Sequence, residues 1–91
     1  MKALRLVVRG RVQGVGYRAW AVGTARALAL DGWVRNRRDG SVEILAAGPD
    51  DALERLVAAC RQGPRLAMVT GIEQHAAAPP EQKGFDQAAT E

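Results

Sequence analysis

Cysteine and histidine are almost absent from this chain of 91 residues, which contains one of each, Cys60 and His75. A single cysteine excludes an internal disulfide, so nothing in the sequence points to an oxidising compartment. One cysteine and one histidine are also too few for the Cys and His ligand sets that hold zinc in proteins. We therefore expect no metal site.

Long hydrophobic runs are lacking as well. Near the start, "ALRLVV" (residues 3–8) is too short and too interrupted by Arg5 for a signal peptide or a membrane span. The hydrophobic fraction of 47% and the charged fraction of 25% are ordinary for a globular protein. We expect a cytoplasmic protein without membrane association, in which residues 1–91 form one domain.

Acidic residues are scarce in the first part of the chain. Residues 1–38 carry nine Lys or Arg and one acid, Asp31, for a net charge of +8, whereas residues 39–91 carry four bases and nine acids, for −5. This asymmetry suits an anionic partner. Charge alone does not separate a small anion from a nucleic acid, or either from an ordinary solvated face.

Hydrophobic periodicity predicts the order strand, helix, strand, strand, helix, strand. Alternating residues predict a strand at 4–10, and "RRDG" (37–40) between two apolar runs predicts a hairpin. Two helices are expected at 17–30 and 49–62, the second with leucine, valine and cysteine at helical spacing. A fourth strand is expected over 65–75 with a bulge near Gly71. The segment 84–91 can add at most a short fifth strand, because Ala88 and Ala89 bury little surface and Asp86 and Gln87 favour strands poorly.

That order predicts an α+β fold: a two-layer βαββαβ sandwich with an antiparallel sheet and both helices on one face. The stretch "RGRVQGVGYR" (9–18) falls between the first strand and the first helix, and it contains three glycines, three arginines and no acid. A helix N-terminus preceded by glycines presents free N–H groups to an anion, and Arg18 is placed to grip two oxygens of that anion. The glycine spacing matches neither a Walker A loop nor a dinucleotide fingerprint. A tight turn that needs glycine only for its backbone remains an alternative.

Two segments resemble the signatures of the acylphosphatase family. "VRGRVQGVGYR" (8–18) is similar to the phosphate loop of that family, and "GWVRNRRDGSVEILAAG" (32–48) to its second signature, with Asn36 in register. The resemblance extends over about residues 4–85. It implies the ferredoxin-like fold and metal-independent, cofactor-free hydrolysis of acyl phosphates to carboxylate and inorganic phosphate.

The resemblance also implies the site residues. Arg18 would bind the phosphoryl group and Asn36 would orient the attacking water, so these are the candidate catalytic residues. The candidate phosphate-binding residues are Gln13, Gly14, Val15, Gly16, Tyr17 and Arg18, with the backbone amides from about Gln13 to Tyr17 surrounding the phosphate. The expected partner is a small acyl phosphate, bound by a monomer without nucleic acid.

The sequence departs from the family pattern in two places. Tyr17 stands where phenylalanine is usual, so its hydroxyl needs a partner or water. The segment after Phe85 lacks the usual apolar alternation, which predicts a frayed edge strand and lower stability but an intact site, since the site residues lie elsewhere in the sequence. Two alternatives stay open: an RNA-binding module of the same βαββαβ order, which the few aromatic residues disfavour, and an anion-binding domain without catalysis.

Overall fold

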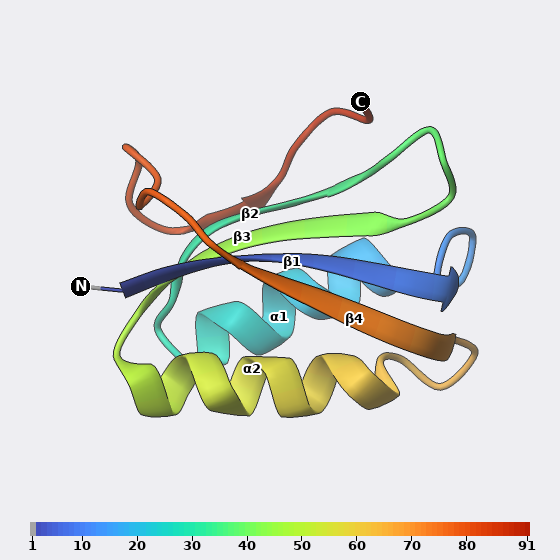
Figure 1. The fold of residues 1–91 in the computed structure, drawn as a ribbon, viewed down its shortest axis with the longest axis horizontal. Coiled ribbons are helices and arrows are strands. Elements are labelled where there is room, and N and C mark those ends of the chain that lie inside the picture. Colours follow the sequence, from blue (N-terminus) through green and yellow to red (C-terminus); the bar gives the residue numbers. More distant parts are fainter. Residues whose placement is uncertain (1) are drawn as a thin grey trace.

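The computed structural model describes residues 2–91 and has the predicted element order (Figure 1). The β-sheet has the strand order β4-β1-β3-β2-β5, and both helices cover one of its faces. This is a ferredoxin-like βαββαβ sandwich with a fifth strand added at one edge. The elements are β1 (Lys2–Arg11), α1 (Tyr17–Ala27), β2 (Asp31–Asn36), β3 (Val42–Gly48), α2 (Asp50–Gln62), β4 (Met68–Ala76) and β5 (Phe85–Gln87).

Strand pairing is antiparallel between β4 and β1, β1 and β3, and β3 and β2, as predicted. The exception is β5, which runs parallel to β2. A parallel neighbour requires a crossover, and the chain supplies one by running from β4 at one edge to β5 at the other. The predicted antiparallel sheet is thus correct for the first four strands and wrong for the last.

The core lies between the sheet and the helices. Small residues on α1, Ala21 and Ala25, are fully buried, so this helix packs close to the sheet. The predicted inward face of α2 is confirmed: Leu53, Leu56 and Cys60 are each at most 2% exposed. Burying each leucine contributes about 1.5–3 kcal/mol, which stabilises both helices far more than their intrinsic propensities do.

Gly10 marks the point where β1 leaves the regular sheet. The β1–β4 register shifts between Arg9 and Gly10, and the extra residue on β4 is Thr70, directly beside the predicted bulge position Gly71. Gly10 has φ +125°, and a Cβ there would lie 2.2 Å from the carbonyl oxygen of Met68. Only glycine fits this position, so the bulge fixes where the following loop begins.

The C-terminal segment, residues 88–91, continues along β2 after β5 has ended. Ala88 N–H donates to the Val34 carbonyl at 2.8 Å, and Glu91 N–H donates to the Asn36 carbonyl at 3.1 Å. The side chains of Glu91 and Arg35 also form an ion pair. The fifth strand is therefore short, as predicted, but the residues after it remain hydrogen-bonded to the sheet rather than frayed.

Candidate active site

The glycine loop, residues 12–16, connects β1 to α1 at the end of the molecule that also contains the β2–β3 hairpin (Figure 1). Gly14 and Gly16 have φ of +73° and +79°, and Gly16 is the N-cap of α1. No side chain caps this helix. Among the loop and cap backbone hydrogen bonds found in residues 2–91, none is donated by an N–H of residues 13–18. These amides are therefore available to an anion at the positive end of the helix dipole.

A small cavity of about 160 Å³ opens at this helix start. It is well below the roughly 300–1,000 Å³ of pockets for drug-sized ligands, and its size suits a small anion. Arg18 enters it from the first turn of α1. Asn36 enters it from the end of β2, on the same strand face as the buried Val34. The lining residues are Val12, Gly14, Gly16, Tyr17, Arg18, Ala19, Asn36 and Gln87.

The guanidinium of Arg18 has no acidic partner among residues 2–91. Arg35 and Arg37, in contrast, both pair with the carboxylate of Glu43, together with Arg5. Glu43 thus holds the guanidinium groups of these two hairpin arginines, and neither residue lines the cavity. Arg18 is the cation in the cavity that stays free to bind an anion.

The acidic side chain of Glu43, at the start of β3, is buried and only 4% exposed. Its burial opposes ionisation, but hydrogen bonds from Arg35, Arg37 and Arg5 outweigh that cost and hold the pKa of the Glu43 carboxyl below its usual value. Glu43 lies on the sheet face opposite the helices, because its neighbour Ile44 points into the core. It stabilises the hairpin that carries Asn36 without lining the cavity.

Two of the candidate phosphate-binding residues do not line the cavity. The Gln13 side chain turns away and donates hydrogen bonds from Nε2 to the carbonyls of Arg37 (2.7 Å) and Ser41 (2.9 Å). Val15 packs against the core. Gly14, Gly16, Tyr17 and Arg18 do line the cavity. Gln13 instead ties the glycine loop to the β2–β3 hairpin, and so it links the two segments that carry Arg18 and Asn36.

Tyr17 has the partner that its hydroxyl requires. The ring is buried, and Oη donates a hydrogen bond of 2.7 Å to the carbonyl of Cys60. Burial raises the pKa of the Tyr17 hydroxyl far above its usual value, so the group stays protonated. Burial also raises the pKa of the Cys60 thiol, to about 11. Tyr17 therefore supports the start of α1 and does not act as a proton-transfer group.

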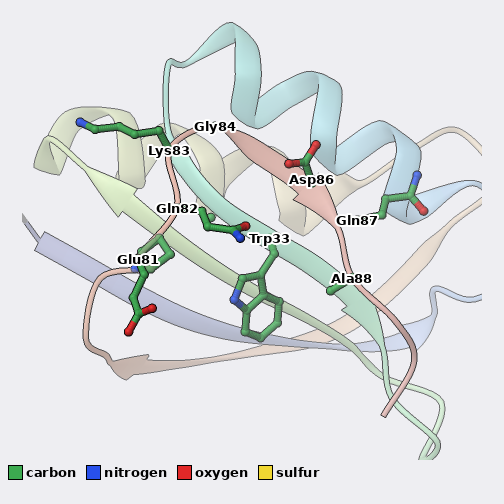
Figure 2. A pocket seen from close by; sticks show the side chains of 10 residues that line it. Trp33, Glu81, Gln82, Lys83, Gly84, Asp86, Gln87 and Ala88 are labelled. Carbon is green, nitrogen blue, oxygen red and sulfur yellow. The ribbon is translucent and has the colours of Figure 1, made fainter.

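Gln87 also lines the cavity, although the site residues predicted from the sequence all lie elsewhere in the chain. Gln87 reaches the cavity because β5 pairs with β2, and the register Val34–Gln87 brings it beside the end of β2. Figure 2 shows its side chain extending away from the Trp33 ring, toward the start of α1. Only knowledge of the strand order would have revealed this neighbour.

A second cavity, of about 340 Å³, lies beside Trp33 between β2, β5 and residues 80–84 (Figure 2). It shares Gln87 with the first cavity but contains neither Arg18 nor Asn36. Residues 2–91 contain no group of three Cys, His, Asp or Glu side chains placed to hold a metal ion. In the same range, neither helix has the length and apolar character needed to cross a bilayer.

The sandwich and the open helix start together define a ferredoxin-like fold whose glycine loop has backbone amides without protein partners. The family model "Acylphosphatase" matches residues 4–87. An acylphosphatase of Acidiphilium cryptum is 56% identical over 90 residues, covering 99% of each chain, and one of Rhodospirillum rubrum is 51% identical, covering 96% of each. The crystal structure of acylphosphatase from Bacillus subtilis superposes with a TM-score of 0.91 at 42% identity, over 97% of this chain and 99% of that one. The chain belongs to the acylphosphatase family, whose members are hydrolases that act on acid anhydrides.

Proposed function

We propose that this protein hydrolyses acyl phosphates to a carboxylate and inorganic phosphate, by means of its own side chains and backbone amides. One observation carries the proposal: an unpaired Arg18 guanidinium, a set of unbonded loop amides and the Asn36 carboxamide meet at one cavity. The relatives, which are named acylphosphatases over nearly the whole chain, support the same activity.

The phosphoryl group binds at the start of α1. Its equatorial oxygens accept hydrogen bonds from the amides of Gly14, Gly16 and their neighbours, and from the planar fork of Arg18. Phosphoryl transfer is catalysed mainly by positioning and by fixed positive charge, with little covalent participation of the protein. Backbone amides held by the loop fold provide such charge without reorganisation during the reaction.

Asn36 orients the attacking water. Its carboxamide accepts a hydrogen bond through Oδ1 and donates through Nδ2, so it fixes the water's direction without removing a proton. The water oxygen forms a bond to phosphorus, the bond from phosphorus to the acyl oxygen breaks, and the carboxylate leaves with that electron pair. One water proton passes to a phosphate oxygen of the substrate. No Asp, Glu or His lines the cavity among the described residues, which supports this substrate-assisted step.

An assay of benzoyl phosphate hydrolysis in the presence of a chelator tests the activity, with inorganic phosphate as competitive inhibitor. We expect turnover that is insensitive to the chelator and is inhibited by phosphate. Salt-sensitive binding of RNA at low micromolar concentration without hydrolysis would instead support the RNA-binding module. Phosphate binding without turnover would support the inert anion-binding domain.

We propose further that residues 1–91 act as one domain and as a monomer in the cytoplasm. The substrate is a small molecule, and no nucleic-acid or membrane partner is invoked. The half-buried aromatic ring of the sheet, Trp33, already stacks with the Arg35 guanidinium at 4.5 Å, which leaves it poorly suited to stack a base. Sedimentation or size-exclusion measurements at assay concentration test the oligomeric state.

A further inference from the structure

Gln87 and Asn36 project from neighbouring strands into the same cavity. In the parallel β2–β5 pair, Gln87 is in register with Val34. Asn36 lies two residues further along β2, about 6.6 Å away along the strand. Registered residues and their i+2 neighbours share one face of a sheet, so the Gln87 and Asn36 side chains are diagonal neighbours. Both line the cavity at the start of α1.

The Gln87 carboxamide is placed where the strand pattern would call for an apolar side chain. Phe85, two residues earlier on the same face, is 1% exposed and belongs to the core. Gln87 is solvent-exposed, and its carboxamide makes no hydrogen bond with any other residue of 2–91. It therefore presents two N–H donors and one carbonyl acceptor to the contents of the cavity.

An attacking water needs more than one contact to be held in line. One of its lone pairs must point at phosphorus, which leaves its two O–H groups and a second lone pair to be directed. A water held only by the Asn36 carboxamide can still rotate about its hydrogen bond to that group. A second carboxamide at an adjacent strand position removes this freedom.

We propose that Gln87 binds the attacking water together with Asn36. This inference rests on the proposed function, because it assumes that Asn36 contacts the nucleophile. In an in-line displacement the leaving acyl oxygen lies opposite the water. Since Gln87 is the neighbour of Asn36, it belongs to the side of the water and not to the side of the acyl group.

The test compares the wild type with Gln87→Leu, Asn36→Ala and the double variant, using benzoyl phosphate as substrate and inorganic phosphate as inhibitor. Loss of one uncharged hydrogen bond to the nucleophile predicts a kcat about tenfold lower for Gln87→Leu. The inhibition constant of phosphate should stay within about twofold of the wild-type value, because the anion-binding groups are untouched. Both side chains act on one water, so the double variant should lose less than the product of the two single losses.

Gln74→Leu is the matched control, because Gln74 is an exposed glutamine on β4, outside the cavity. It should have wild-type kinetics. Circular dichroism and thermal melting of each variant show whether it is folded. If Gln87→Leu aggregates, Gln87→Ala replaces it with the same expected kinetics.

Three results would overturn the inference: an unchanged kcat for Gln87→Leu, independent losses that multiply in the double variant, or a matching loss of phosphate affinity. Failure of the proposed function looks different. In that case the wild type does not hydrolyse benzoyl phosphate, or Asn36→Ala leaves kcat unchanged. If the wild type hydrolyses benzoyl phosphate and Asn36→Ala lowers kcat, but Gln87→Leu leaves kcat unchanged, only the role of Gln87 is refuted.

Discussion

The hydroxyl of Tyr17, the first residue of α1, donates a 2.7 Å hydrogen bond to the carbonyl of Cys60 in the last turn of α2. In a continuing helix that carbonyl would accept the N–H of residue 64, but residue 64 is proline and has no N–H. Tyr17 therefore satisfies a buried acceptor at a helix end. The bond connects the two helices at the point where the cavity begins.

Tyr17→Phe should lower the free energy of unfolding by about 1–2 kcal/mol, because the Cys60 carbonyl loses its donor while the ring still fills its place. Urea denaturation measures this loss. The kcat for benzoyl phosphate should change less than twofold, since the Tyr17 hydroxyl faces α2 and not the substrate. Cys60→Ala is the control that keeps the carbonyl, so adding Tyr17→Phe to it should cost the same amount. An unchanged stability for Tyr17→Phe would contradict the role assigned to this bond.

Arg18→Ala should reduce kcat/KM by at least ~10²-fold, as expected for loss of a charged group that stabilises the transition state. Phosphate should lose most of its affinity as an inhibitor. Arg18→Lys retains the charge but not the planar fork, and it should recover only part of the activity. Arg38→Ala is a suitable control, because Arg38 is exposed on the hairpin and does not line the cavity. Wild-type kinetics for Arg18→Ala would mean that the anion binds elsewhere.

Asn36→Ala should lower kcat strongly, by about 10²-fold, while the inhibition constant of phosphate changes little. In the proposed mechanism the carboxamide directs water, whereas the amides and Arg18 bind the anion. Steady-state kinetics with phosphate as inhibitor separate the two effects. A parallel collapse of kcat and phosphate affinity would assign Asn36 to the anion instead of the water.

Glu43→Gln should destabilise the protein by about 1–2 kcal/mol at pH 7, because three arginines lose a buried charged acceptor. The pKa of Glu43 is lower in the folded state than in the unfolded chain, so its contribution is complete above the unfolded pKa of about 4.3. That contribution decreases as the pH falls through the folded pKa. The difference between wild type and Glu43→Gln, followed by thermal melting, should therefore shrink below about pH 4. A stability difference between wild type and Glu43→Gln that stays constant down to pH 2 would show that it does not come from the ionised Glu43 carboxylate.

The pH profile of kcat should show no ionisation of a protein side chain near neutrality. No Asp, Glu or His among the described residues lines the cavity, and the buried Tyr17 hydroxyl remains protonated. The ionisation of the substrate itself must first be measured and subtracted. An inflection near pH 7 that persists after this correction would show that a side chain acts as a general base.

Much of the fold could be predicted because its signals are local. The apolar spacing of α2, its two aspartates at the start and Gly63–Pro64 at its end define that helix within a residue or two. The Asp39–Gly40 turn likewise predicted the hairpin between β2 and β3. The position of the bulge was found to within one residue, at Thr70 beside Gly71.

The parts that sequence reasoning missed depend on contacts between distant segments. Nothing local in "GFDQ" reveals that β5 pairs with β2, so the approach of Gln87 to the cavity was not foreseen. Similarly, nothing in the sequence signals that the Gln13 side chain donates hydrogen bonds to the hairpin, 24 residues away. Glu43 likewise has no local signal that it pairs with three arginines, one of which, Arg5, lies on β1.

The hydrogen bonds from Gln13 to the hairpin have a kinetic consequence. They connect the glycine loop to the hairpin next to Asn36, so we expect the two sides of the cavity to keep their separation when a ligand binds. The rate of phosphate release should then depend on the affinity of the glycine loop and Arg18 for phosphate. A higher affinity would lower kcat through product inhibition.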